Sequence, residues 1–307
     1  MRPLLLLLSA LLFIGAAPAA HAAQSYIVID DETGHILASQ NPNEKLQIAS
    51  LTKIATAMVV MDWADSTKSS LAAEVSVPAG AASIGGVNPC GLQAGDQVSL
   101  RDLLYAAMMV SDNHAAYTLA YNVGARLPNP QNLGPVDNFT ATMNALARTL
   151  EMKKTLFLNP HGLDDLDTPP HSTAADVARL TRYAYKHPGF NFYVSQTTRE
   201  ISIRGADGLN RGFVLRNTNE LLGQEEIDGV KTGRTSRAGD CLVLSSGLSP
   251  ATVEVNGQKL AIPRRIIAVL LRSPDRFGEG LQLIRQGWAR HGQWSAEGRL
   301  VTRRSSI

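Results

Sequence analysis

The segment from Ser50 to Ala64 constrains the fold more than any other, because it predicts a helix that is apolar around nearly its whole circumference. Its apolar residues are Leu51, Ile54, Ala55, Met58, Val59, Val60, Met61 and Trp63. A helix on a protein surface has one apolar stripe, whereas a helix that is apolar all round is buried. We therefore expect this helix to be central in the fold.

The other predicted elements are segregated along the chain. Predicted strands span 26–30, 35–38, 229–245, 251–255 and 260–271, with a further hairpin at 201–215. Predicted helices span 99–109, with Ser99 as its N-cap, 113–125, 136–151, 173–187 and 281–290, and 75–98 is predicted to be a loop with short strands. Asn256-Gly257 is a strong signal for a hairpin turn. Regular βα alternation is missing, so the order favours an α+β fold, in which helices pack against an antiparallel sheet and form a mostly helical subdomain.

The first residues are typical of a secretory signal peptide. A short basic start is followed by an apolar run from Leu4 to Ile14 and by the small-x-small sequence Ala20-His21-Ala22. The apolar run is too short for a good transmembrane span, which needs about 20 residues. We therefore expect a signal peptide over 1–22, a single domain over 23–294 and a basic tail over 295–307, with export to the periplasm or the extracellular wall space and no stable membrane anchor after cleavage.

The composition excludes several classes of protein. Hydrophobic residues make up 44% of the chain and charged residues 18%, which is typical of a globular protein with a proper core. A net charge of +2 gives no electrostatic basis for binding nucleic acid. Two cysteines cannot form a four-cysteine zinc site, and the scattered histidines lack zinc-type spacing, so we expect neither a metal nor another cofactor.

The two cysteines are a separate question. An oxidising compartment allows a disulfide between Cys90 and Cys241, but Cys241 fits a buried thiol equally well. The sequence gives no distance between them, and we favour free thiols.

The first of three short motifs is Ser50-Leu51-Thr52-Lys53 at the start of the predicted central helix. Residues three apart share one helix face, so the Lys53 amine can reach the Ser50 hydroxyl. A nucleophilic serine needs an adjacent base, and an amine can act as that base when burial lowers its pKa. About one S-x-x-K occurs by chance in a chain of this length, so the motif alone is a weak signal.

The other two motifs are Ser111-Asp112-Asn113, between two predicted helices, and Lys231-Thr232-Gly233, in a predicted strand. The first offers a hydroxyl and an amide to a cleft, although all three residue types also serve as helix caps. The second offers a cation and a hydroxyl that suit a substrate carboxylate. A glycine in a strand is typical of a site where a ligand approaches the backbone closely, although an ordinary edge strand explains this motif too.

Together, in the order S-x-x-K, S-D-N and K-T-G, the motifs form the set found in class A β-lactamases and penicillin-binding proteins. From about 25 to 288 the chain resembles the low-molecular-mass penicillin-binding proteins, the serine D-alanyl-D-alanine carboxypeptidase family (peptidase S11-like). Further stretches similar to this family are 157–163, 217–222 and 238–243. The resemblance is to the short form of the family, which lacks a C-terminal β domain and an amphipathic anchor.

The resemblance implies a serine peptidase that acts on the D-Ala-D-Ala ends or the D-Ala-containing cross-links of peptidoglycan stem peptides. Ser50 would attack the penultimate D-Ala carbonyl, and Lys53 would be the general base. Ser111 would pass the proton to the leaving D-Ala, with Lys231 nearby, and Asn113 would hold the substrate peptide. β-Lactams resemble the D-Ala-D-Ala end, so the resemblance also implies that they acylate Ser50 as covalent inhibitors.

The resemblance extends to the substrate carboxylate and the oxyanion. Lys231 and Thr232 would bind the terminal carboxylate, and Gly233 would allow the close approach. The backbone N–H groups of Ser50 and Arg234 would form the oxyanion hole. An arginine after the last strand would assist with the carboxylate, and Arg276 is the nearest match, with Arg272 as the alternative.

Three other functions remain open at this point. S-D-N is the β-lactamase form of the middle motif, but a class A β-lactamase needs a deacylating glutamate, and 157–168 supplies only Asp164, Asp165 and Asp167 as acids. A non-catalytic peptidoglycan-binding module would not need all of the intact catalytic residues. A transpeptidase, in which an amine replaces water as the acceptor, cannot be distinguished by motifs.

Overall fold

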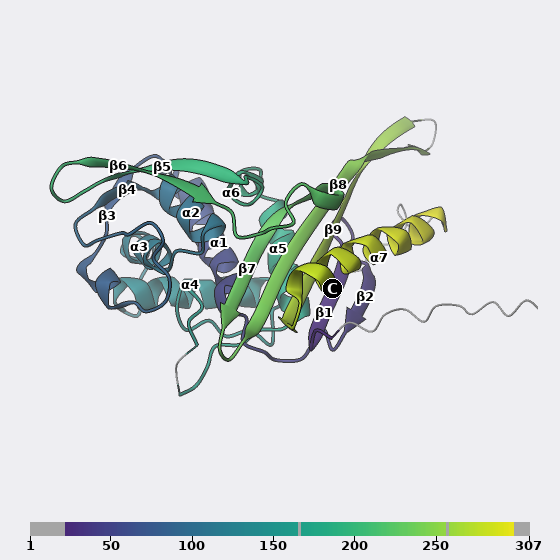
Figure 1. Ribbon diagram of the computed structural model, residues 1–307, viewed down its shortest axis with the longest axis horizontal. Coiled ribbons are helices and arrows are strands. Elements are labelled where there is room, and N and C mark those ends of the chain that lie inside the picture. Colours follow the sequence, from purple (N-terminus) through teal and green to yellow (C-terminus); the bar gives the residue numbers. More distant parts are fainter. Residues whose placement is uncertain (1–21, 165–166, 256–257, 298–307) are drawn as a thin grey trace, which may run out of the picture.

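The computed structural model describes residues 22–164, 167–255 and 258–297. Its larger sheet is antiparallel with the strand order β2-β1-β9-β8-β7, as Figure 1 shows. The strands are β1 (Ser25–Asp30), β2 (Ile36–Gln40), β7 (Ile227–Thr235), β8 (Gly239–Val255) and β9 (Gln258–Ser273). β1 pairs with β9, so the two ends of the domain meet inside this sheet.

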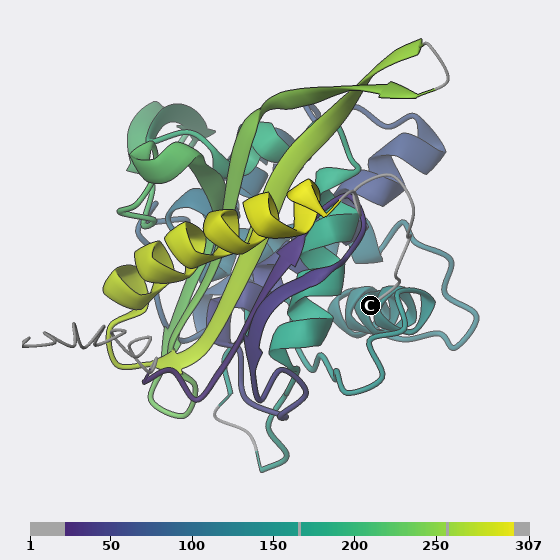
Figure 2. The ribbon, with the colours of Figure 1, turned by 90° about the vertical axis from the view of Figure 1, so that its right-hand side faces the viewer.

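Alternating side chains of the sheet form two apolar cores. Val243 and Val269 belong to the core shared with the helical part, whereas their neighbours Leu242 and Leu270 belong to the core under α7 (Arg276–Ala296). This alternation follows from the two-residue period of a strand. Figure 2 shows α7 lying across one face of the sheet. α5 (Ala174–Tyr185) packs on the other face against β1 and β9, and α1 (Lys53–Thr67) packs against α5.

The helical part is built around α1. All residues from Lys53 to Met61 are buried, so the prediction of a central helix is confirmed. α2 (Leu100–Met109), α3 (Asn113–Gly124) and α4 (Pro135–Thr149) pack around it. The predicted N-cap of α2 is also confirmed, because the Ser99 hydroxyl accepts a hydrogen bond from the Asp102 N–H.

The predicted α+β class is confirmed, but the structure adds a second sheet that the sequence analysis did not resolve. This antiparallel sheet has the order β3-β4-β5-β6 and consists of Glu74–Ser76, Gln97–Ser99, Thr198–Arg204 and Asn210–Arg216. The hairpin at 201–215 and the short strands near 75–98 were predicted, but not their pairing. The short helix α6 (Phe190–Val194) and the 3-10 turns η2 (Ala79–Ser83) and η3 (Gln224–Glu226) were also not predicted.

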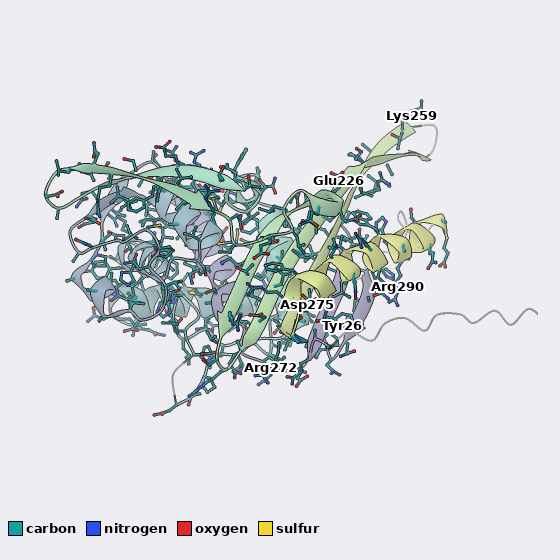
Figure 3. The ribbon with its side chains drawn as sticks, viewed as in Figure 1. Tyr26, Glu226, Lys259, Arg272, Asp275 and Arg290 are labelled. Carbon is teal, nitrogen blue, oxygen red and sulfur yellow. The ribbon has the colours of Figure 1, made fainter. Side chains whose placement is uncertain are left out.

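Two helix starts differ from the predictions. Ser50 lies in the 3-10 turn η1 (Ala49–Thr52), and the α-helix begins only at Lys53. α7 was predicted over 281–290 but begins at Arg276, where the Asp275 side chain caps it by accepting from the Gly278 N–H. Glycine is a poor helix former, and Gly278 and Gly280 weaken the helical pattern of the first turns. Figure 3 labels Asp275 at the start of α7 and Arg272 near the end of β9.

Some predictions fall outside the described residues. These are residues 1–21 of the predicted signal peptide, the Asn256-Gly257 turn and residues 298–307 of the predicted tail. The first two residues of the predicted tail, Ser295 and Ala296, belong to the end of α7. In the described part of the chain, no helix combines the length and apolar character needed to cross a membrane. Cys90 and Cys241 are both buried free thiols, as we favoured.

Close contact between α7 and the sheet depends on Gly287, and this gives a stability prediction. A Cβ atom at Gly287 would lie 2.8 Å from a Val28 methyl and 2.9 Å from an Ile266 methyl. We expect Gly287→Ala to lower the free energy of unfolding by about 1–2 kcal/mol, because overpacking outweighs the better helix propensity of alanine. Denaturant unfolding measures this change.

Gly292 provides the matched control in the same helix, since a Cβ there meets nothing within 4 Å. Gly292→Ala should raise the free energy of unfolding by about 0.5–1 kcal/mol. Equal effects of the two substitutions would show that α7 does not pack on the sheet as described.

Candidate active site

The Lys53 amine lies at the centre of a cluster of polar groups. Its Nζ is 3.0 Å from Ser50 Oγ, 2.7 Å from Asn113 Oδ1 and 2.9 Å from the carbonyl oxygen of His161. Lys53 is fully buried, whereas Ser50 is partly exposed. The structure therefore brings together Lys53 and Asn113, the last residues of two motifs, which are 60 positions apart in the sequence.

The environment of Lys53 favours a neutral amine. Burial lowers the pKa of Lys53 well below its ordinary value, and the positive charge of Lys231 lowers it further. The carboxylate of Asp112 opposes the shift, but it is the smallest of the three causes. A neutral amine has a lone pair, so Lys53 can accept a proton from the adjacent Ser50 hydroxyl.

The second motif forms the junction between α2 and α3. Ser111 has a left-handed backbone with φ of 62°. Asp112 is the N-cap of α3 and accepts from the Ala115 N–H at 2.9 Å. The Asn113 amide, expected to hold substrate, makes two contacts inside the protein: it accepts from Lys53, and its Nδ2 donates to the Gly85 carbonyl at 3.0 Å. Among the described residues, no hydrogen-bond partner is seen for the Ser111 hydroxyl.

The third motif lies on β7, the edge strand of the larger sheet. Lys231 is buried, and its Nζ donates to the Thr232 carbonyl at 3.0 Å. Burial lowers the pKa of Lys231 to about 7, and the positive charge of Arg276 contributes to this shift. The Thr232 hydroxyl is 2.7 Å from the Thr218 hydroxyl, which belongs to the family-like stretch 217–222.

Gly233 also serves packing within the chain. The approach of a ligand to its backbone stays a prediction, and the turn η1 occupies the side on which a Cβ atom would lie. A Cβ atom at Gly233 would lie 3.1 Å from both the Ser50 nitrogen and the Ile48 carbonyl oxygen. The missing side chain therefore lets β7 lie against the turn that carries Ser50.

Arg276 reaches the third motif, whereas Arg272 does not. Arg276 NH1 donates to the Gly233 carbonyl at 3.2 Å and lies 3.4 Å from Asp240 Oδ1. Asp240 is also 3.4 Å from Arg234 Nε, and the Arg234 side chain is 76% exposed. Arg272 is exposed and donates to the Gln24 and Gln47 side chains and to the Arg237 carbonyl. A cavity of about 570 Å³ borders Arg234 and Asp240.

The loop at 157–163 contributes a group that the sequence analysis missed. We assigned His161 only a loop-shaping role, but its backbone carbonyl accepts a hydrogen bond from Lys53. Thr56 Oγ1 on α1 donates to the Pro160 carbonyl at 2.6 Å and holds the loop in place. Burial is the main cause that lowers the pKa of His161 to about 3, and a positive charge on Lys53 is the next cause. This imidazole is therefore neutral. No residue type marks a functional backbone carbonyl in a sequence.

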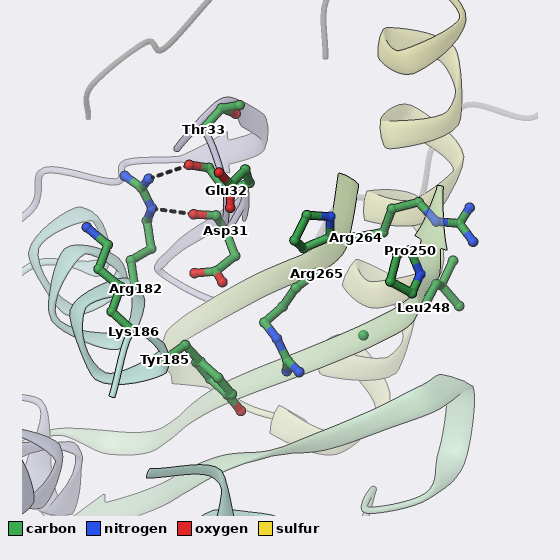
Figure 4. A pocket seen from close by; sticks show the side chains of 12 residues that line it. Asp31, Glu32, Thr33, Arg182, Tyr185, Lys186, Leu248, Pro250, Arg264 and Arg265 are labelled. Atoms are coloured by element: carbon green, nitrogen blue, oxygen red, sulfur yellow. Dashed lines mark hydrogen bonds between the residues drawn. The ribbon is translucent and has the colours of Figure 1, made fainter. Parts of the chain in front are cut away.

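A larger cavity lies elsewhere, and none of the predicted site residues lines it. It measures about 830 Å³ and lies between the β1–β2 turn, the end of α5 and the outer parts of β8 and β9. Figure 4 shows Arg182 donating to the carbonyls of Asp31 and Glu32 at its wall, with Tyr185 and Arg265 at its floor. The Arg265 guanidinium stacks on the Tyr185 ring at 4.2 Å and pairs with Asp228. Within the described ranges, no cluster of three or more potential metal ligands is found.

The coupling between Arg276 and Lys231 gives a prediction about charge. Arg276→Gln removes a positive charge that disfavours the Lys231 ammonium, so the pKa of Lys231 should rise above 7. An NMR titration of the labelled lysine side chain measures this value in both proteins. Arg285→Gln, which changes an exposed arginine on the same helix, is the control and should leave the titration unchanged. An unaltered midpoint in Arg276→Gln would contradict the coupling.

Residues 13–254 match the family model described as D-alanyl-D-alanine carboxypeptidase, peptidase family S11. The chain is 32% identical over 228 residues to D-alanyl-D-alanine carboxypeptidase DacF of Bacillus subtilis (strain 168), covering 74% of this chain and 54% of that protein. It is 34% identical over 239 residues to the D-alanyl-D-alanine endopeptidase of Pseudomonas aeruginosa, covering 76% of this chain and 70% of that protein. The chain thus spans just over half the length of the Bacillus relative.

A solved structure shows the same fold. Penicillin-binding protein D2 from Listeria monocytogenes, in its ampicillin-bound form, superposes with a TM-score of 0.68 at 27% identity, covering 89% of this chain and 100% of that one. The match extends over both the helical part and the larger sheet, and the family model covers all three motifs. The chain therefore belongs to the D-alanyl-D-alanine carboxypeptidase family, the S11 peptidases.

Proposed function

We propose that this protein is a serine DD-peptidase that hydrolyses D-Ala-D-Ala ends or D-Ala-containing cross-links of peptidoglycan stem peptides. The observation that carries the proposal is the fully buried Lys53 amine 3.0 Å from the partly exposed Ser50 hydroxyl. This pair supplies a nucleophile and a base whose pKa is lowered, which acyl transfer requires. The names of the relatives, carboxypeptidase and endopeptidase, support the substrate class.

The proposed reaction proceeds through an acyl-enzyme. Neutral Lys53 takes the Ser50 proton as Oγ attacks the penultimate D-Ala carbonyl, and the backbone N–H groups of Ser50 and Arg234 stabilise the oxyanion. Ser111 relays that proton from Lys53 to the leaving amine as the C–N bond breaks, which returns Lys53 to its neutral form. Water then attacks the ester and gives a proton to Lys53, which passes it to Ser50 Oγ as the shortened peptide leaves.

Lys231, Thr232 and Arg276 are proposed to bind the terminal carboxylate. Arg276 already contacts the Gly233 carbonyl, so its guanidinium lies beside the strand that presents the other two. β7 is an edge strand, which leaves one side of its backbone open to an extended peptide. We propose that this chemistry takes place in the periplasm or the wall space, where peptidoglycan is found.

A class A β-lactamase is the weaker alternative. Segment 157–168 lacks a glutamate, and the carboxylate of Asp164 is buried and accepts from the Thr235 hydroxyl at 2.6 Å. Asp164 is thus engaged in a structural contact with β7. A non-catalytic module is disfavoured because Ser50, Lys53 and Lys231 are all present and close together.

Acylation by benzylpenicillin tests the serine mechanism. Mass spectrometry should show a covalent adduct on Ser50 that persists after the free drug is removed, because the site lacks a glutamate to activate the deacylating water. Ser50→Ala should show no adduct. Loss of the adduct within seconds, with turnover of the drug, would favour the β-lactamase, and no adduct at all would overturn the serine mechanism.

The base can be tested separately. Lys53→Met keeps the length and apolar stem of the side chain and removes the amine, so the rate of acylation should fall by about 10²–10⁴. Stopped-flow absorbance with a chromogenic cephalosporin measures this rate. Lys68→Met, an exposed lysine at the end of α1, is the control and should acylate at the wild-type rate. Near-wild-type acylation by Lys53→Met would exclude Lys53 as the base.

The pKa of Lys231 gives a pH prediction. Its positive charge is present below about pH 7 and is lost as pH rises through that value. Binding of a free terminal carboxylate should therefore weaken above pH 7, and KM for a stem pentapeptide should rise while KM for its C-terminal amide stays constant. Parallel pH profiles for the two peptides would contradict the carboxylate role of Lys231.

A cross-linked dimer of stem peptides, used as substrate in the same assay, distinguishes endopeptidase from carboxypeptidase activity.

A further inference from the structure

Three consecutive residues, Asp112, Asn113 and His114, hold one loop, residues 84–92, against the start of α3. Asp112 Oδ2 accepts from the Cys90 N–H at 3.1 Å. The Asn113 N–H donates to the Val87 carbonyl at 2.9 Å, and its Nδ2 donates to the Gly85 carbonyl. The loop lies so close that a Cβ at Gly86 would be 2.2 Å from Asn113 Nδ2.

His114 contacts both ends of this loop. Its Nε2 is 3.2 Å from the Ile84 carbonyl oxygen, and its Nδ1 is 3.4 Å from the Leu92 carbonyl oxygen. A carbonyl oxygen can only accept, so each ring nitrogen must donate to satisfy its contact. A neutral imidazole has one N–H and an imidazolium has two. Only the imidazolium therefore makes both hydrogen bonds.

The charged groups around His114 are compatible with an imidazolium. Burial raises the pKa of Asp112, and a positive charge on His114 is the smallest of the causes that oppose this rise. His161, on the facing loop, is neutral because its pKa is lowered to about 3, so it adds no competing positive charge. Cys90, on loop 84–92, has a raised pKa and stays a neutral thiol.

Loop 84–92 is connected to the proposed base through one amide. The Gly85 carbonyl receives the Asn113 NH2 group, which directs Oδ1 of the same amide to Lys53 Nζ at 2.7 Å. Any loosening of the loop frees the Asn113 amide to rotate. The contacts therefore connect His114 to the two ends of loop 84–92, and the Gly85 carbonyl in this loop to Asn113 and Lys53.

We propose that His114 is a positioning residue whose imidazolium form fastens loop 84–92 at both ends and so fixes Asn113 against Lys53. The inference rests on the proposed function of Lys53. It makes the preorganisation of the site dependent on the protonation state of His114, because a neutral imidazole has one N–H and keeps only one of the two loop contacts.

The test compares wild type with His114→Gln, whose uncharged amide can donate to only one of the two carbonyls. The rate constant of acylation by benzylpenicillin is measured for both at pH 5.5 and pH 8.5, and the ratio of the two proteins is taken at each pH. The titrations of Lys53 and Lys231 affect both proteins and cancel in this ratio. We expect wild type to be faster by about two- to tenfold at pH 5.5, the range of one hydrogen bond, and equal at pH 8.5.

Hydrogen exchange supplies a readout that does not depend on activity. The peptide containing Cys90 and Leu92 should exchange faster in His114→Gln than in wild type at pH 5.5 and at the same rate at pH 8.5. His187→Gln is the matched control, because His187 pairs with the exposed Asp65 on the surface of α1 and α5, and it should show neither effect. If His114→Gln does not fold, His114→Asn replaces it in both measurements.

The outcomes separate the two proposals. A rate ratio that is the same at both pH values would assign His114 a purely steric role, and a ratio of one throughout would exclude any role, so either overturns the inference. Wild type that is not acylated at all contradicts the proposed function, while the exchange data still decide whether the imidazolium holds the loop.

Discussion

The architecture of the site depends on the cost of burying the Lys53 amine. A lysine nitrogen without partners would be strongly destabilising inside a protein, and here three oxygen atoms surround it. These oxygens come from the turn η1, the start of α3 and the loop at 157–163, so three separate parts of the chain must be held in place around α1. The apolar surface of α1 provides that fixed reference.

The positive groups of the site differ in burial. Lys53 and Lys231 are both fully buried, and the charge of Lys231 lowers the pKa of Lys53, whereas Arg276 is partly exposed and always charged. Arg276 disfavours the Lys231 ammonium, and the Lys231 ammonium disfavours the Lys53 ammonium. A permanent cation at the rim therefore weakens, through Lys231, one of the two effects that keep the amine beside Ser50 neutral.

The sequence predicted the parts that are encoded locally. The apolar run of α1, the Ser99 cap and the strands around Lys231 follow from periodicity and residue type, and the order of the three motifs identified the family. It did not predict the pairing of β3 to β6, the start of α7 or the carbonyl of His161, because these depend on tertiary contacts or on backbone atoms common to all residues. The contact of Gly233 with the distant turn η1 was not predicted for the same reason.

The pairing of β1 with β9 has a consequence for the order in which the chain is synthesised. Ser50 emerges early, but the strand that lies against it comes after residue 226, and the N-terminal hairpin joins the larger sheet only through β9. Such long-range pairing forms late in folding. A growing chain therefore carries its serine long before the groups around it can assemble, so its reactivity is withheld until almost the entire domain exists.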